Sequence, residues 1–155
     1  MLILHAVVGA ALVGAATHLV VWTWGFWRRK TARARGVRRF AWIVAALFAA
    51  NLLLGLLIYP VYKIRVRSEY LDEPAAAEPH YQQTVKVARW FDVKEHVIAL
   101  GFAVALGLLW MVSAWNPKRD GDAIAPVIAG LAMVTAATTW FAAIVGLLVT
   151  SYRAI

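Results

Sequence analysis

The sequence predicts an all-α integral membrane protein, a four-helix bundle that forms a single transmembrane domain over residues 1–155. Three observations support this prediction. The composition is 63% hydrophobic and 15% charged, with a mean hydropathy of +0.68, whereas soluble domains are roughly 45–50% apolar and 25% charged. Four apolar segments are each long enough for a span, which takes about 20 residues. A strongly basic loop follows the first of them and gives the chain an orientation.

The first predicted span covers residues 2–27. It carries no formal charge, and three tryptophans gather between positions 22 and 27, as in the aromatic belts of membrane–water interfaces. The basic residues follow this segment instead of preceding it, which distinguishes it from a cleaved signal peptide. The second predicted span, 40–62, closes with Pro60, because a proline can end or kink a helix.

The third and fourth predicted spans, 90–115 and 125–150, are separated by a compact turn at 116–122 that begins with Asn-Pro. The segment 63–89 lies between the second and third spans and differs from them, because it mixes basic with acidic residues and lacks long apolar runs. We expect it to be an external loop. The alternation in its first residues allows a short strand and equally allows an extension of the preceding helix.

Lysine and arginine are unevenly distributed over the connecting segments. Seven of them fall within 28–39 and two more within 116–122, against four within 63–88 and one in the C-terminal tail. The positive-inside rule therefore predicts that both chain ends lie outside (N-out, C-out), and we expect the bacterial inner (plasma) membrane. The net charge of +8 does not indicate nucleic acid binding, because the basic residues adjoin apolar spans, where they set topology and contact anionic lipid.

Several kinds of chemistry are excluded by what the sequence lacks. No cysteine is present, which rules out disulfides, zinc–thiolate and iron–sulfur sites and a catalytic thiol. No glycine-rich phosphate loop or HExxH motif occurs either, so hydrolytic catalysis of the soluble type is not indicated. If the protein is redox-active, we expect an electron-transfer protein or a subunit of an oxidoreductase.

Polar and ionisable side chains inside the spans are the functional candidates, because a charge there costs about 2.5–3.5 kcal/mol on insertion scales. In chain order they are His5, His18, Asn51, Asp92, Lys94, Glu95 and His96. With a rise of about 1.5 Å per residue, His5 and His96 both fall in the outer half of the bilayer, about 14 and 10 Å from their span midpoints. At about 100° per residue, Asp92 and His96 head a stripe of small residues on the third span.

Haem b, in one or two copies, is the most specific cofactor that these residues can support. His5 and His96 are the candidate axial ligands of an outer haem, and Asp92 is the candidate hydrogen-bond partner that orients His96. Arg65 and Arg67 are the candidate partners of its propionates, because arginine suits carboxylates.

A second, inner haem would use His18 and Met133, which fall at similar depths. The general plan is similar to that of small four-helix membrane b-type cytochromes in helix number and in having histidines within the membrane. The haem prediction implies transmembrane or outer-face electron transfer, with a quinone or a redox protein as partner at the outer face.

Two other classes of function stay open beside the haem class. The first is a cofactor-free accessory or assembly subunit of a larger membrane complex or homo-oligomer, in which each histidine is hydrogen-bonded to a neighbouring helix. The second is proton or metal-ion transport through an ionisable cluster at the outer boundary, made of His5, Asp92, Glu95 and His96. In all three classes the lipid bilayer is the immediate partner.

Overall fold

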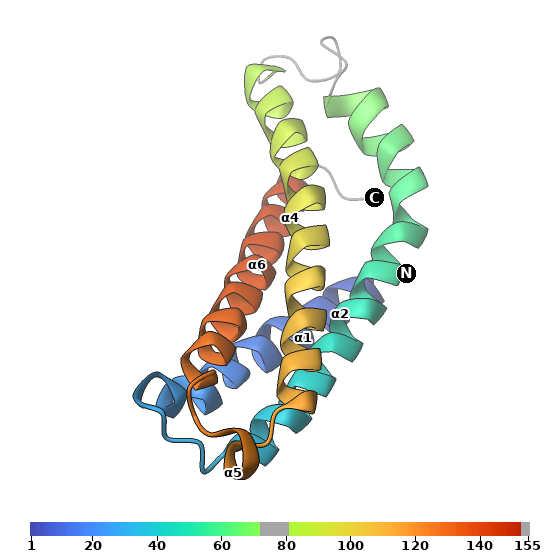
Figure 1. The fold of residues 1–155 in the computed structure, drawn as a ribbon. Coiled ribbons are helices and arrows are strands. Elements are labelled where there is room, and N and C mark those ends of the chain that lie inside the picture. Colours follow the sequence, from blue (N-terminus) through green and yellow to red (C-terminus); the bar gives the residue numbers. More distant parts are fainter. Residues whose placement is uncertain (72–80, 153–155) are drawn as a thin grey trace.

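The computed structural model describes residues 1–71 and 81–152, and every regular element within these ranges is a helix. In chain order the elements are α1 (Leu2–Thr23), the 3₁₀-helix η1 (Trp24–Arg28), α2 (Ala34–Tyr62), the π-helix η2 (Lys63–Leu71), α4 (Tyr81–Ala114), α5 (Pro117–Asp120) and α6 (Ala125–Tyr152). Within the described ranges, four helical segments, built on α1, α2, α4 and α6, are long and apolar enough to cross a membrane (Figure 1). The predicted all-helical fold with four membrane helices is confirmed, and its N-out, C-out orientation stays a prediction.

Each of the four long helices packs against two others, in the cyclic order α1, α2, α4, α6. The diagonal pairs of the bundle are therefore α1 with α4 and α2 with α6. Figure 1 shows α4 and α6 running side by side, while α1 crosses the bundle obliquely. This oblique course brings the first turn of α1 against the middle of α2, where Gly55 faces the ring of His5.

Buried side chains form two groups at different heights of the bundle. The large cluster draws on α1, η1, α2, α4 and α6, and includes Leu12, Leu19, Phe26, Phe48, Leu108 and Ile128. The small cluster draws on α2, η2, α4 and α6, and consists of Tyr62, Val66, Leu71, Val87, Ala88, Val145 and Val149. Because α1 contributes nothing to the small cluster, this end of the bundle has three helical segments instead of four.

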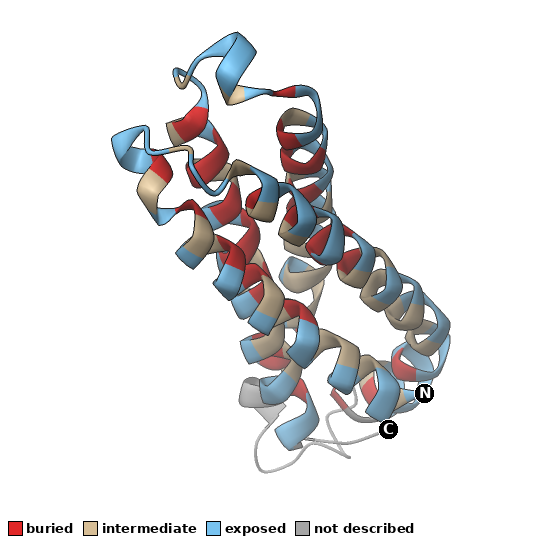
Figure 2. Cartoon of the chain, turned by 90° about the horizontal axis from the view of Figure 1, so that it is seen from below, coloured by how far each residue is buried: buried red, intermediate tan, exposed pale blue. Residues whose placement is uncertain are grey.

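The outward faces of the bundle are apolar as well. Only 17–33% of each apolar window in the four membrane helices is buried. Figure 2 shows buried residues on the faces that look into the bundle and exposed ones on the outer faces. Apolar surface of this extent needs lipid or protein contact in place of water.

Of the alternatives left open for segment 63–89, the structure shows helix over 63–71 and 81–89. The placement of this segment outside the membrane stays a prediction. Pro60 lies inside α2 and has no N–H to bond the carbonyl one turn earlier, and the wider π-helical pattern of η2 begins three residues later. Val66 and Leu71 of η2 are buried against the first turns of α4. Their burial holds the segment on the bundle, and the rest of the expected loop, 72–80, lies outside the described residues.

The opposite end of the bundle is closed by side-chain hydrogen bonds to backbone carbonyls. Arg38 of α2 donates from Nε to the Val112 carbonyl and from Nη2 to the Trp115 carbonyl, both at 2.8 Å. Trp115 is buried and donates from its indole Nε1 to the Gly121 carbonyl at 2.9 Å. The two Arg38 bonds satisfy carbonyls at and just after the end of α4 that have no partner within the helix, and the Trp115 bond ties this end to the residue that follows α5.

Candidate binding site in a polar layer between the clusters

Three polar side chains from three helices, His5 of α1, Asn51 of α2 and Lys94 of α4, form what we call the polar layer. It separates the two clusters. Lys94 lies between Phe91, which packs on the small cluster, and Ile98, which packs on the large one. Asn51 lies on α2 one turn beyond Phe48, the last residue that this helix gives to the large cluster. His5 contacts α2 at Gly55, one turn beyond Asn51.

Each side chain of the polar layer lies beside a glycine of a neighbouring helix, at a distance that an added Cβ would turn into ordinary van der Waals contact. A Cβ on Gly55 would lie 3.5 Å from Cε1 of His5, and one on Gly9 would lie 3.5 Å from Oδ1 of Asn51. A Cβ on Gly146 of α6 would lie 3.7 Å from Nζ of Lys94. All four long helices therefore contribute to this level of the bundle, three through polar side chains and α6 through backbone.

The polar layer has hydrogen-bonding capacity that the described part of the chain does not use. His5 Nδ1 and Asn51 Oδ1 are buried, and neither has a partner among the described residues. Lys94 forms no ion pair with a described residue, and its Nζ lies 4.9 Å from the centre of the Phe91 ring. A buried group without its hydrogen bond costs about 1–3 kcal/mol, and an unpaired buried charge costs more. The layer therefore contains buried polar atoms whose hydrogen bonds the described residues do not supply.

His96 lies on a different face of α4 from Lys94. The two residues are separated by about 200° around the helix axis at about 100° per residue. His96 is exposed, and its Nδ1 lies 2.8 Å from the Asp92 carbonyl oxygen in the preceding turn. Lys94 thus lies on the half-buried side of α4 and His96 on an exposed side, while the pairing of His5 with His96 on one haem iron stays a prediction.

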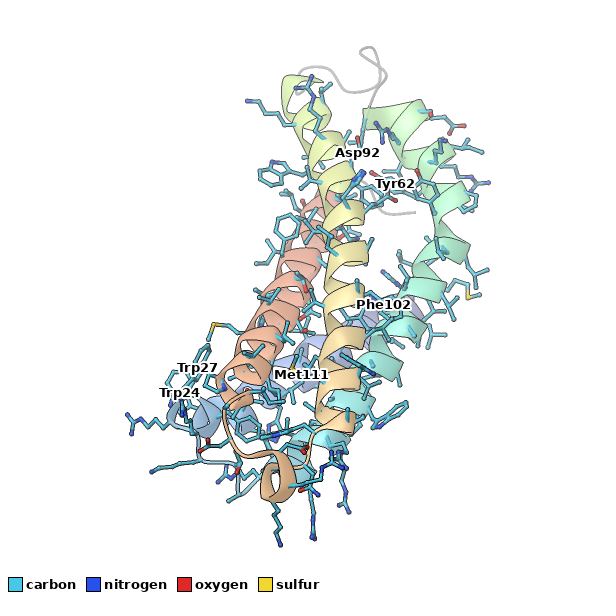
Figure 3. All side chains as sticks on the ribbon, viewed as in Figure 1. Trp24, Trp27, Tyr62, Asp92, Phe102 and Met111 are labelled. Atoms are coloured by element: carbon cyan, nitrogen blue, oxygen red, sulfur yellow. The ribbon has the colours of Figure 1, made fainter. Side chains whose placement is uncertain are left out.

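Asp92 and Arg67 bind each other. The Arg67 guanidinium donates to the Asp92 carboxylate, which links η2 to α4. Figure 3 shows Asp92 on α4 directed toward the end of α2, where Tyr62 lies, and the Tyr62 ring stacks on Phe91 at 3.9 Å between centroids. Asp92 therefore contacts His96 through its backbone carbonyl, while its carboxylate accepts a hydrogen bond from the Arg67 guanidinium. Arg65 is exposed on η2.

The inner pair from the sequence, His18 and Met133, is placed on exposed surface. The indole Nε1 of Trp22 donates to Nε2 of His18 at 2.6 Å, and the Phe40 ring lies 4.7 Å from the imidazole between centroids. Met133 is 42% exposed on α6. The Nε2 lone pair of His18 that an iron would need is thus already used by Trp22.

The described residues contain no cluster of side chains that could ligate a metal ion such as zinc. Among residues 1–71 and 81–152, no three histidine, aspartate or glutamate side chains gather as a metal ion would require. A haem iron needs only two axial ligands, so this finding bears on ions such as zinc and not on haem.

Lys94 and Asn51 are the residues to which sequence reasoning gave no role. A signal for Lys94 was present, because it shares one helical face with Ile98, Gly101, Ala105 and Leu108, all buried or half-buried. A lysine that heads the core-facing stripe of a membrane helix is directed into the bundle. The stripe below His96 contains Ala99, Ala103 and Gly107, which are exposed.

These features define the class of the protein, a helical membrane protein with four long apolar helices and a polar layer inside the bundle. No protein-family model, curated protein or solved structure matches the chain.

Proposed function

We propose that the protein binds a lipophilic carrier of the quinone class, whose headgroup lies in the polar layer. The observation that carries this proposal is that His5 Nδ1 and Asn51 Oδ1 are buried without a hydrogen-bond partner among the described residues. The half-buried Lys94 faces the same interior from α4 and forms no ion pair with a described residue. Membrane interiors rarely keep such groups unless they serve a function. A ligand that enters from the lipid would satisfy them without opening the bundle to water.

The chemistry of the polar layer matches both redox forms of a quinone. The Lys94 ammonium is a charged donor that suits a carbonyl oxygen, while Asn51 Oδ1 is an acceptor that suits the hydroxyl of a quinol. His5 can act in either direction through its neutral ring. The aromatic residues on either side, Phe91 and Phe48, belong to the clusters above and below and offer apolar surface to the ring.

Haem b is the second candidate cofactor, and one observation favours it. His96 holds its Nδ1 against the Asp92 carbonyl, the arrangement that leaves Nε2 of a histidine available to a metal. His5 offers a buried Nδ1 without a hydrogen-bond partner among the described residues. A haem and a quinone together would make an electron-transfer protein, and purified protein would then show a Soret band and a reduced α-band that His96→Ala abolishes.

The quinone proposal is tested with detergent-purified full-length protein. Organic extraction followed by chromatography is expected to release quinone, and decylubiquinone is expected to bind saturably. Lys94→Met removes the charged donor while keeping an unbranched side chain, and should weaken binding by roughly 10–100-fold, the value of one hydrogen bond to a charged group. Asn51→Leu should weaken it as well.

Lys86→Met is the matched control, because Lys86 is exposed on the same helix, about 12 Å along the axis from Lys94. It should bind decylubiquinone as the unmodified chain does. Equal affinities of the Lys94 and Lys86 variants would contradict the proposal. Decanoate is the second probe: displacement of decylubiquinone by decanoate at similar concentration would show that the layer takes carboxylates and not quinones.

A further inference from the structure

A basic segment and a surface hollow lie together at the C-terminal end of α1, apart from the polar layer. The segment 28–39 that follows it contains seven lysine and arginine residues and no acidic residue. Beside it lies a surface hollow of about 360 Å³, lined by Val21, Trp22, Trp24, Gly25, Lys30, Ala32 and Arg33. Since one water occupies about 30 Å³ in the liquid, this hollow has room for a headgroup of several heavy atoms.

The hollow is shaped by the way the chain turns after α1. Arg29 adopts a left-handed backbone conformation with φ of 56°. The Lys30 N–H then donates to the Gly25 carbonyl at 3.0 Å, which folds the loop back toward η1. A Cβ on Gly25 would lie 3.3 Å from the Lys30 carbonyl oxygen, so the close return of the chain favours glycine at this position. The turn thus fixes Lys30 next to the two tryptophans.

The charges at the hollow are all of one sign. Lys30 and Arg33 are exposed, and neither forms an ion pair with a described residue. The Arg33 guanidinium carbon lies 5.8 Å from the centre of the Trp22 ring, within cation–π distance, which holds the guanidinium beside the hollow. Two cations on an indole wall form a receptor for an anion that accepts several hydrogen bonds.

The remaining walls are apolar and face the lipid. Val21 is 57% exposed and Trp24 is 64% exposed, and Figure 3 shows Trp24 at the end of α1, away from the bundle interior. Tryptophan at the end of a membrane helix lies at the level of lipid headgroups. The occupant that fits both parts of the hollow has a phosphate for the cations and an acyl chain for Val21.

We propose that this hollow is a binding site for an anionic phospholipid, with its phosphate between Lys30 and Arg33 and an acyl chain along Val21 and Trp24. Basic pockets beside membrane helices bind such headgroups, and each lysine or arginine near the surface contributes to affinity. The site is distinct from the polar layer, so its failure and that of the quinone proposal are separable.

The test is native mass spectrometry of the full-length protein with added dioleoylphosphatidylglycerol or dioleoylphosphatidylcholine. The unmodified chain should retain phosphatidylglycerol adducts in preference to phosphatidylcholine. The double variant Lys30→Gln/Arg33→Gln should bind phosphatidylglycerol about thirtyfold more weakly. Thermal melting of the variant serves to confirm that it folds.

The control removes the same charge elsewhere on the same end of the bundle. Lys118→Gln/Arg119→Gln alters the turn at α5, outside the hollow, and should keep phosphatidylglycerol binding within about threefold of the unmodified chain. Equal losses in the two double variants would overturn the proposal, because they would reduce the effect to net charge. Displacement of the lipid by millimolar inorganic phosphate would overturn the assignment to a phospholipid.

Discussion

Gly101 lies where α4 and α6 pack tightly at Thr138, and its replacement tests that packing. A Cβ at Gly101 would lie 2.5 Å from Oγ1 and 2.8 Å from Cβ of Thr138, and 3.3 Å from the Phe48 ring. The hydroxyl of Thr138 can rotate away, but its Cβ moves only with the backbone of α6. Ordinary contact begins at 3.4 Å, so Gly101→Ala requires α6 to shift by about 0.6 Å.

The expected loss of stability in Gly101→Ala follows from comparison with a second glycine on the same helix. Gly107 has no atom within 4 Å of an added Cβ. Both substitutions gain the same helix propensity, up to about 1 kcal/mol, and only Gly101→Ala adds overpacking of about 1–3 kcal/mol. The difference between the two variants is therefore about 1–3 kcal/mol. This corresponds to a Tm lower by about 2–12 °C for Gly101→Ala at 2–4 °C per kcal/mol.

The assay is thermal unfolding in one detergent, followed by circular dichroism, with both variants at equal concentration. Gly107→Ala should melt at or above the temperature of the unmodified protein. If the two variants melt together, α4 and α6 do not approach at Gly101, and the assignment of helix faces on which the polar layer depends is refuted.

Two further predictions concern the end of the bundle at α5. Arg38→Met removes two bonds from a charged donor to the Val112 and Trp115 carbonyls and should lower the free energy of unfolding by about 1–3 kcal/mol, measured by thermal or denaturant unfolding; an unchanged stability would contradict the capping role. The Arg119 guanidinium, hydrogen-bonded to the Asp120 carboxylate, lowers the pKa of that carboxyl below its ordinary value. The pairing therefore stabilises the turn above the ordinary aspartate pKa and is lost as pH falls through the lowered pKa. Carboxyl NMR should show this pKa rise in Arg119→Gln, and an unchanged pKa would contradict the pairing.

The helical fold and its four apolar segments were predictable because lipid imposes length and composition on a membrane helix. The sequence left the course of 63–89 open between a loop, a short strand and an extension of the preceding helix, and the structure buries Val66 and Leu71 of this segment together with Tyr62. The charged residues between them suggested a loop. Tertiary contacts determine the conformation of this segment, because η2 packs on α4 and Arg67 forms an ion pair with Asp92 across that contact.

The candidate site was predictable in its residue types and not in its geometry. The depth of a residue along a span follows from counting residues, so the depth of His5 in the membrane could be predicted from the sequence. The inward face of a helix is harder to infer when apolar residues surround it, because lipid and protein interior select the same side chains. His96 and Lys94, two residues apart, were therefore ranked by chemistry, and the structure places Lys94 in the layer and His96 on the exposed side.

The central claim is that the polar layer exists to hold a ligand, and the thermal stability of Lys94→Met tests it most directly. A lysine that serves ligand binding is expected to destabilise the ligand-free protein, because an unpaired buried charge lowers the free energy of unfolding. We expect ligand-free Lys94→Met to melt above the unmodified protein by about 2–4 °C per kcal/mol gained, and to lose the rise in Tm that decylubiquinone gives the unmodified protein and Lys86→Met. A Lys94→Met protein that melts lower, with no effect of decylubiquinone on any variant, would show that Lys94 is part of the packing and would contradict the account.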